Sequence, residues 1–277
     1  MKVQEGQVLP GRALPFVGSC QWILSLDYDE TLRSSHPGQP VPPAFFELMQ
    51  QWRGCGIRWG INTGRTLPYL CQELLPGSPF LPDFICTCER YVYIAQPDGA
   101  LVPLRAHNER CLIHNMEVRE RVQPMLHAQL QVLRSRFKHL EWVLAADDPL
   151  SVEARDSATM DSIMAFLLPF VQSLVGVTAQ RAGRYMRLAD ARYCKGTALR
   201  TVAEQWNVPE ERWALLGDGH NDLQAFRLFP KAFCAAPSNA HPDVRAYLLS
   251  SGGYVSSSTG VMEILERWRD SVMTKLR

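Results

Sequence analysis

The sequence LSLDYDETL, residues 24–32, decides the fold of this chain. An apolar run ends there in Asp27 and Asp29, two carboxylates that a single residue separates. A buried strand that stops at such a turn presents both carboxylates at its carboxyl end, where open α/β sheets bind their ligands. Such oxygens suit Mg²⁺, and one carboxylate can also act as a nucleophile. The stretch therefore predicts a parallel sheet with a candidate reactive site at its edge.

Strands and helices alternate on both sides of the middle of the chain, which predicts a Rossmann-like α/β core with a parallel sheet covered by helices. Before the middle, the hydrophobic pattern predicts strands over 21–26, 57–61 and 83–88 and helices over 45–52 and 67–75. After it, the pattern predicts strands over 213–216 and 231–236 and helices over 196–206, 242–249 and 260–276, with a short helix following residue 222.

The middle of the chain has a different pattern. Turn residues separate three expected hairpins, 91–95 with 100–104, 141–146 with 150–155, and 177–180 with 185–188. Helices are expected over 117–137, where Pro124 marks a kink or the true start, and along the apolar stripe of residues 160–174. We interpret residues 89–189 as an inserted α+β domain with an antiparallel sheet. Residues 1–88 and 190–277 then form the core domain.

Composition excludes several functions. The chain has 277 residues, a hydrophobic fraction of 46% and a net charge of +1, so no bulk field favours nucleic acid or an anionic membrane. Residues 1–17 do not resemble a secretory signal, and no apolar run is long enough to span a membrane. Eight cysteines lack a framework spacing, which favours reduced thiols in a cytoplasmic protein. Cys86 and Cys88 favour a structural role over a metal site.

Three further groups of polar residues follow expected strands or begin expected helices. Thr63 comes directly after an apolar strand, and Gly64 permits a phosphate to approach the backbone. Lys195 opens a helix, a position that opposes the helix dipole unless an anion lies between them. Each of these two groups also has a purely structural alternative. Residues 63–64 would form an ordinary turn, and Lys195 would be a solvated lysine at the surface.

The fourth group is GDGHND, residues 217–222. Two glycines surround Asp218 at a strand end, and Asn221 and Asp222 follow within five positions, a pattern that favours ion or phosphate binding over a plain turn. The four groups complement one another, because paired carboxylates need a divalent cation to approach a phosphate. A lysine and hydroxyl donors then neutralise a transferring phosphoryl group.

In this order the four groups resemble the four motifs of the haloacid dehalogenase superfamily of phosphohydrolases. Residues 27–31, 62–65, 195–196 and 217–222 match its first to fourth motifs. The insert between the second and third motifs resembles the Cof-like and sucrose-phosphatase-like branch, whose large α+β cap selects the substrate. Glu30 stands where that family often has glycine, and Glu89-Arg90 where Cof-like relatives commonly have Asn-Gly. These departures leave the substrate open.

The resemblance implies a role for each matched residue. Asp27 would attack phosphorus, and Asp29 would protonate the leaving alcohol and then activate water. Mg²⁺ would be held by Asp27, the Asp29 carbonyl and Asp218, with Asp222 either as a further ligand or as a neighbour of the ligands. The phosphoryl oxygens would be held by Thr63, Gly64, Lys195 and Asn221. Arg65 would support the phosphate-binding loop.

Other side chains keep two interpretations. His220 is expected at the surface, with contact to the substrate as the alternative. Arg181, Arg184 and Arg187 belong to the last expected hairpin, where a solvated edge is favoured over contact with an anionic substrate.

The resemblance thus implies a Mg²⁺-dependent phosphomonoester hydrolase that acts through an aspartyl-phosphate on a small phosphorylated metabolite, a sugar phosphate being the first expectation. Two alternatives stay open: a sugar phosphomutase or phosphotransferase of the same superfamily, and a non-catalytic phosphometabolite-binding protein. Neither nucleic acid nor a membrane is expected as a partner, and the oligomeric state is open.

Overall fold

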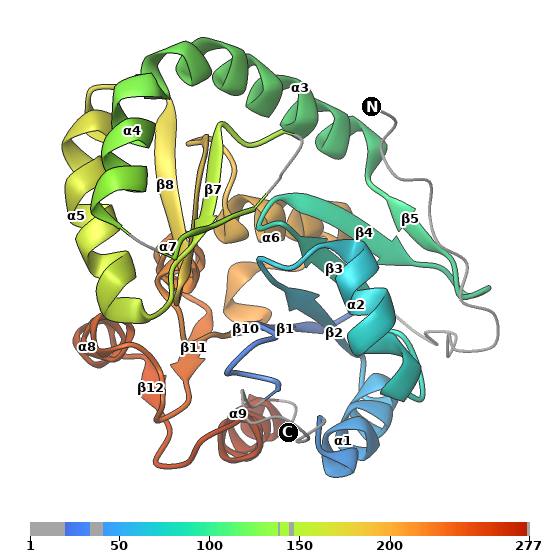
Figure 1. Ribbon diagram of the computed structural model, residues 1–277. Helices are drawn as coiled ribbons and strands as arrows, with labels where there is room; N and C mark the ends of the chain where they lie inside the picture. The colour runs from blue at the N-terminus through green and yellow to red at the C-terminus, as the bar shows by residue number, and fades with distance from the viewer. Residues whose placement is uncertain (1–19, 34–40, 138, 144–146, 276–277) are drawn as a thin grey trace. The chain divides into compact units, whose positions relative to one another are not determined.

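A computed structural model describes residues 20–33, 41–137, 139–143 and 147–275, and the chain forms two compact units (Figure 1). The first unit comprises residues 1–107 and 195–277, and the second comprises residues 108–194. The second unit is therefore inserted between two halves of the first. These limits place residues 89–107 with the first unit and residues 190–194 with the second, which differs from the limits expected from the sequence.

The first unit is built on an eight-stranded sheet in the order β12-β11-β10-β1-β2-β3-β4-β5. Its strands are β1 (Trp22–Leu26), β2 (Ile57–Asn62), β3 (Phe84–Thr87), β4 (Tyr91–Ala95), β5 (Leu101–Pro103), β10 (Trp213–Leu216), β11 (Phe233–Ala236) and β12 (Tyr254–Val255). Neighbouring strands from β12 to β3 pair in parallel, and β4 and β5 complete the sheet in antiparallel pairs. The expected α/β class with a mostly parallel sheet is confirmed.

Helices cover both faces of this sheet, because its central strands are apolar on both sides. Trp22 and Leu24 of β1 pack into one hydrophobic cluster, and Ile23 between them packs into the other. The first cluster includes side chains of α1 (Pro43–Gly54), α2 (Leu67–Glu73) and α9 (Met262–Lys275). The second includes those of α6 (Lys195–Trp206), α7 (His220–Leu228) and α8 (Pro242–Ser251). Single 3-10 turns lie at η1 (Leu75–Gly77) and η3 (Glu210–Arg212).

The second unit has a four-stranded antiparallel sheet in the order β6-β7-β9-β8. Its strands are β6 (Glu141–Trp142), β7 (Leu150–Glu153), β8 (Val177–Ala182) and β9 (Tyr185–Asp190), and its helices are α3 (Arg105–Val122), α4 (His127–Arg136) and α5 (Ser157–Gln172). The Asp156 carboxylate caps α5 by accepting a hydrogen bond from the Thr159 amide. The apolar stripe of α5 is buried with Val152 and Leu188 of the sheet.

Two expectations about the middle of the chain are wrong. The hairpin of β4 and β5 continues the large sheet through β3 instead of joining the antiparallel sheet. The helix expected to begin at residue 117 begins at Arg105. The hydrophobic pattern did not reveal this start, because the first turns of α3 are polar on most sides and lack a clear apolar stripe. Pro124 lies in a 3-10 turn, η2 (Gln123–Leu126), that separates α3 from α4. The end of the hairpin strand expected over 141–146 lies outside the described residues, as does residue 276 of the last expected helix.

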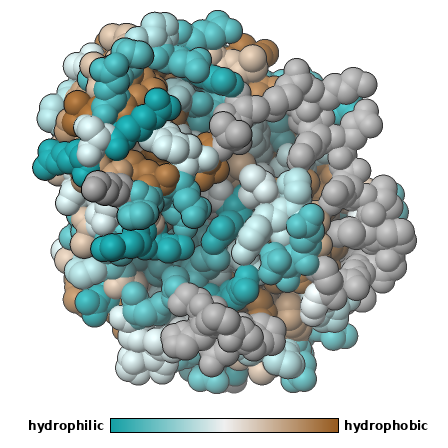
Figure 2. Space-filling model, in the orientation of Figure 1, coloured by the Kyte–Doolittle hydropathy of each residue, from teal (hydrophilic) through white to brown (hydrophobic). Residues whose placement is uncertain are grey.

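Within the described residues, no helix has both the length and the apolar character that crossing a membrane requires. Hydrophilic colours predominate on the face seen in Figure 2, with apolar residues in smaller separate patches.

All eight cysteines are free thiols. The groups of described residues that can hold a metal include no cysteine, so Cys86 and Cys88 keep their structural interpretation.

Close packing at the centre of the large sheet leads to a prediction about Gly60 of β2. A methyl group there would lie 2.3 Å from the Phe84 ring on the neighbouring strand β3. Gly60→Ala should therefore lower the free energy of unfolding by about 1–3 kcal/mol, the usual effect of an overpacked core. Urea unfolding followed by circular dichroism measures the change.

The matched control is Gly54→Ala at the end of α1, where an added methyl group has no neighbour within 4 Å. This variant should be stabilised by about 0.5–1 kcal/mol, because alanine favours the helix. Equal stability of the two variants would contradict the role of Gly60 in strand packing.

Candidate active site

The carboxyl ends of β10, β1 and β2 lie side by side and bring three of the sequence motifs together. The Asp27 amide continues the pairing of β1 with β10 by donating to the Leu216 carbonyl at 2.8 Å. At the end of β2, the Asn62 side chain donates to the Lys195 carbonyl at 3.1 Å, which joins the second motif to the first residue of α6. The expected convergence at one edge of the sheet is therefore present in the geometry.

Lys195 is the centre of this group. Its ammonium Nζ lies 2.9 Å from Asp27 Oδ1 and 2.8 Å from Asp222 Oδ1, and the lysine side chain is 0% exposed. Burial alone would lower the pKa of Lys195, but the carboxylates of Asp222 and Asp27 raise it above its ordinary value. Lys195 is thus a fixed cation, and the alternative of a solvated surface lysine is wrong.

Asp218 completes a group of three carboxylates. The Thr31 hydroxyl donates to Asp218 Oδ1 at 2.7 Å, and carboxylate oxygens of Asp27, Asp218 and Asp222 lie within 4.8 Å of one another. Burial raises the pKa of Asp27 and Asp222, with Lys195 opposing the change in both. Burial, followed by the charge of Asp222, raises the pKa of Asp218 to about 7.

The charges and ligand atoms of this group fit a divalent cation. Three carboxylates face one ammonium, so full ionisation leaves two negative charges in excess in a buried place, and burial raises the pKa of all three carboxyls. All the converging ligand atoms are oxygen, as hard cations such as Mg²⁺ require. Asp27, Asp218 and Asp222 are the residues that can hold the ion.

The loop after β10 positions Asp222 and depends on Gly217. Asp222 is the third residue of α7, and its Oδ2 accepts a hydrogen bond from the Gly219 amide at 3.0 Å, which satisfies a free N–H at the helix start. A methyl group on Gly217 would lie 2.1 Å from the Asp222 carboxyl carbon. Only glycine therefore leaves room for this carboxylate beside Lys195.

The second motif forms a tight loop, in which the Thr63 hydroxyl accepts a hydrogen bond from the Arg65 amide at 3.1 Å. Thr63 is buried, Gly64 is half-buried and Arg65 is exposed. The Arg65 guanidinium makes a two-point contact with Asp29, at 2.7 Å from Nε and 3.3 Å from Nη2. The Asp29 carboxylate therefore contacts Arg65 and lies outside the group of three carboxylates. The Asp29 side chain is thus not among the converging metal ligands.

Glu89 is a site residue that the sequence reasoning treated only as a departure from the family pattern. It follows β3, is 1% exposed, and its Oε1 accepts a hydrogen bond from the Asn221 side chain at 3.0 Å. Its amide donates to the Thr63 carbonyl at 3.0 Å, so Glu89 connects the second and fourth motifs. Its position after an expected strand was a usable signal, because the other site residues occupy equivalent positions.

Two residues that depart from the family pattern, Glu30 and Glu89, have positive φ angles. Glu30 has a φ of 59°, in the left-handed region that favours glycine, which explains why glycine is common at this position in the family. Glu89 has a φ of 63°. Such backbone in a non-glycine residue costs about 1–3 kcal/mol and persists where surrounding contacts hold it. The Asn239 side chain supplies such a contact by donating to the Glu30 carbonyl at 3.0 Å.

His220 lies in a second group of side chains, with His241 and Asp243. Its Nε2 lies 3.3 Å from Asp243 Oδ2, and its ring lies against that of His241. In the second unit, Arg187 and Arg181 are buried, which contradicts the favoured reading of a solvated edge for these two residues. Arg187 donates to Gln180, and Arg181 pairs with Asp161. Arg184 is 58% exposed, as that reading expects, and pairs with Glu153.

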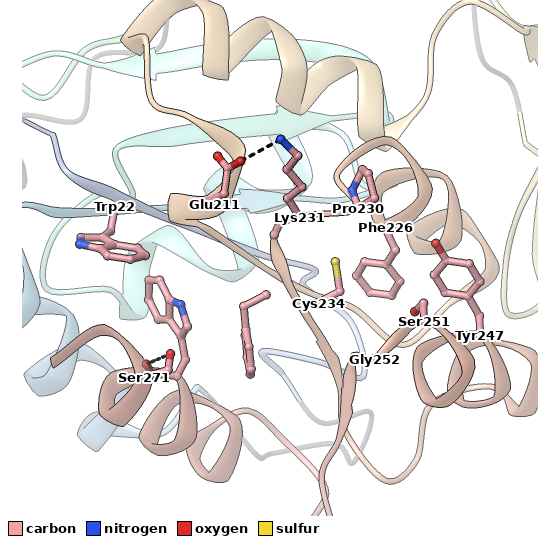
Figure 3. A pocket seen from close by; sticks show the side chains of 14 residues that line it. Trp22, Glu211, Phe226, Pro230, Lys231, Cys234, Tyr247, Ser251, Gly252 and Ser271 are labelled. Atoms are coloured by element: carbon pink, nitrogen blue, oxygen red, sulfur yellow. Dashed lines mark hydrogen bonds and ion pairs between the residues drawn. The ribbon is translucent and has the colours of Figure 1, made fainter. Parts of the chain in front are cut away.

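A separate pocket of about 370 Å³ lies at the opposite end of the strands (Figure 3). Its lining includes Trp22 and Phe233, the first residues of β1 and β11, whereas the carboxylate group follows the last residues of β1 and β10. Figure 3 shows the ion pair of Lys231 and Glu211 at this pocket, with a 3.0 Å separation. The pocket is thus no part of the candidate active site.

Comparison with known proteins agrees with this geometry. A family model described as haloacid dehalogenase-like hydrolase matches residues 106–265, more than half of the chain. The chain belongs to the haloacid dehalogenase-like hydrolases. This membership confirms the resemblance to the family and the expectation of an enzyme.

Individual relatives either have low sequence identity to this chain or match only part of it. The chain is 24% identical over 258 residues to a phosphoglycolate phosphatase of Natronomonas pharaonis, a match that covers 90% of this chain and 98% of the relative. A phosphoglycolate phosphatase of Methanothrix thermoacetophila is 34% identical over 82 residues, which cover 28% of this chain and 34% of the relative.

Solved structures share the fold. A sucrose-phosphatase from Synechocystis superposes with a TM-score of 0.63 at 18% identity, covering 90% of this chain and 97% of that one. A haloacid dehalogenase-like hydrolase from Bacillus subtilis gives a TM-score of 0.63 at 15% identity, covering 94% and 95%. At these identities the likeness concerns the fold alone.

The excess negative charge predicts how the stability depends on Asp218 and pH. Without metal at pH 8, Asp218→Asn should unfold at a higher temperature than the wild type, because it removes one repelling charge and keeps the oxygen that Thr31 contacts. The folded pKa of Asp218, about 7, lies above its unfolded value, so the destabilisation is present above pH 7 and fades as the pH falls. The advantage of the variant should therefore shrink towards pH 5.

Added Mg²⁺ should reverse the order of the two proteins. A ligand that binds only the folded state at a hundred times its Kd adds about 2.7 kcal/mol to the stability, and the wild type keeps the full set of carboxylates. Differential scanning fluorimetry with and without Mg²⁺ measures both effects. An equal rise of the melting temperature in the two proteins would contradict the assignment of Asp218 as a ligand.

Proposed function

We propose that the chain is a Mg²⁺-dependent phosphomonoester hydrolase that acts through an aspartyl-phosphate on a small phosphorylated metabolite. The main support is the position of Lys195, whose buried ammonium lies between Asp27 and Asp222 within a group of three carboxylates. A buried cation beside a carboxylate at a strand end suits the transfer of an anionic phosphoryl group to that carboxylate.

In the proposed first step, an Asp27 oxygen forms a bond to phosphorus while the bond from phosphorus to the alcohol oxygen breaks. Asp29 gives its proton to that leaving oxygen. In the second step Asp29 takes a proton from a water molecule, the water oxygen bonds to phosphorus, and the bond from phosphorus to Asp27 breaks. Phosphate is released and Asp27 is restored, so the two steps balance as hydrolysis.

Arg65 is proposed to position Asp29 between these proton transfers. Its two-point contact with the carboxylate fixes the orientation of an otherwise exposed side chain. Such a contact lets Asp29 face the leaving oxygen instead of joining the other carboxylates. We also propose that Arg65 supports the loop of the second motif, as the family resemblance implies.

The remaining charge is proposed to be neutralised around the phosphoryl oxygens. Lys195 supplies a permanent positive charge, and Thr63, the Gly64 backbone and Asn221 supply hydrogen-bond donors. Mg²⁺, bound by Asp27, Asp218 and Asp222 and also by the Asp29 carbonyl, would add positive charge that lets a phosphate approach the carboxylates. Glu89 holds Asn221 through the contact with its side-chain nitrogen.

The substrate is proposed to be a small phosphorylated metabolite. The motif resemblance favours a sugar phosphate, whereas the full-length relative from Natronomonas pharaonis is named for phosphoglycolate. We further propose that the first unit is the catalytic core and that the inserted second unit selects the substrate. A cytoplasmic location is also proposed, and the eight free cysteines support it.

Asp27→Asn should abolish turnover, because an amide oxygen is a poor nucleophile, while leaving the circular dichroism spectrum unchanged. Removal of divalent cations by EDTA should silence the wild type, and Mg²⁺ should restore it. Asp98→Asn is the control, since Asp98 lies in an exposed turn and contacts only the Ala100 amide in the structure. Full activity of the Asp27 variant would rule out the mechanism.

A panel of phosphoesters with Mg²⁺ identifies the reaction and the substrate. Sugar phosphates and phosphoglycolate are compared by the inorganic phosphate released. Free phosphate is the expected product. Isomerised sugar phosphate from glucose 1-phosphate or mannose 1-phosphate would instead identify a phosphomutase, and tight binding without turnover across the panel would favour a sensor.

Glu89 should affect turnover through Asn221. Glu89→Ala removes the acceptor of the Asn221 hydrogen bond and should lower kcat/KM by about tenfold to a hundredfold, the usual worth of a hydrogen bond to a charged group. Glu89→Gln keeps an oxygen acceptor and should retain most of the activity. An equal loss in the glutamine and alanine variants would show that the charge of Glu89, and not its contact, matters.

A further inference from the structure

Two histidines and an aspartate converge outside the carboxylate group. His220 is the first residue of α7, His241 precedes α8, and Asp243 is the second residue of α8. The ring centroids of the histidines are 3.8 Å apart, and one ligand atom from each of the three residues lies within 4.8 Å of the others. The proposed phosphatase reaction uses none of the three.

The two separations from the Asp243 carboxylate lie close to those between the ligands of one tetrahedral ion. His220 Nε2 lies 3.3 Å from Asp243 Oδ2, and His241 Nδ1 lies 3.7 Å from the same oxygen. A tetrahedral ion with bonds of about 2.0–2.1 Å to nitrogen and oxygen separates its ligands by about 3.3–3.4 Å. A movement of the His241 ring away from His220 would therefore let the three ligands bind one ion and leave its fourth position to water.

We propose that His220, His241 and Asp243 form a binding site for a divalent transition-metal ion of the Zn²⁺ type. Imidazole nitrogen favours Zn²⁺, Co²⁺ or Ni²⁺ over Mg²⁺, whereas the all-oxygen group of Asp27, Asp218 and Asp222 favours the hard ion. The two groups thus differ in ligand chemistry, and one protein can hold both ions at once.

The surroundings of the site permit an ion to enter. The side chains of His220 and His241 are 24% and 33% exposed, and that of Asp243 is 69% exposed. The starts of α7 and α8 carry partial positive charge, which opposes a cation, and the Asp243 carboxylate offsets it. The Asp243 amide also donates to His241 Nδ1, but at 3.3 Å this contact is long, and a metal ion competes with it for the same nitrogen.

The site is tied to the loop of the fourth motif, so the experiment must separate the two groups. The His241 amide donates to the Asp218 carbonyl at 2.9 Å, and His220 lies two residues after Asp218. The full chain is therefore freed of metal, saturated with Mg²⁺, and titrated with Zn²⁺ by calorimetry. Co²⁺ replaces Zn²⁺ in a parallel titration, in which the visible spectrum reports nitrogen ligation.

His241→Asn is the main variant, because asparagine is a good helix cap and keeps an acceptor for the Asp243 amide while removing the imidazole. His220→Gln is the second variant. The wild type should bind one equivalent of Zn²⁺ at micromolar free ion in the presence of Mg²⁺, and both variants should lose it. Asp218→Asn and the exposed control His127→Ala should retain it.

The proposal is overturned if the Mg²⁺-saturated wild type binds no Zn²⁺, or if the His241 and His220 variants bind it as the wild type does. It is also overturned if Asp218→Asn loses the equivalent, since the ion would then occupy the carboxylate group. None of these measurements depends on catalytic turnover, so failure of the proposed phosphatase reaction leaves the result readable.

Discussion

The buried ammonium of Lys195 is the contact on which the proposed site depends. It lies between carboxylates from the first and fourth motifs, and the carbonyl of the same residue accepts a hydrogen bond from the second motif. Removing one partner of such a buried pair leaves an uncompensated charge and typically costs about 3–5 kcal/mol. Three segments that are distant in the sequence are thereby held at one edge of the sheet.

The same place carries more negative than positive charge, and the proposed chemistry depends on this excess. A fold selected for stability alone would not bury Asp27, Asp218 and Asp222 around a single lysine, since burial raises the pKa of all three carboxylates. The arrangement is stable when a cation and a phosphate share the charges. Stability and proposed function are therefore linked through the same side chains.

Much of the core was predictable because its signals are local. Continuous apolar runs, such as the one before Asp27, mark strands that are buried on both faces, and the alternation with helices specifies parallel pairing. The β4–β5 hairpin was assigned to the wrong sheet because a turn signal says that two strands pair and nothing about the third strand beside them. The start of α3 was missed because its first turns carry no apolar stripe, and β12 was missed because it has two residues.

By itself the sequence determined the α/β class, the insertion, and which four segments carry the side chains of the proposed site, because each of these is written in the order and spacing of residues. Only the tertiary structure decided which side chains meet. It placed Asp29 on Arg65, joined Glu89 to Asn221, and gathered His220 and His241 around Asp243. These contacts depend on backbone directions and on the packing of helices at the sheet edge, which arise when the chain folds and are not encoded in any local pattern.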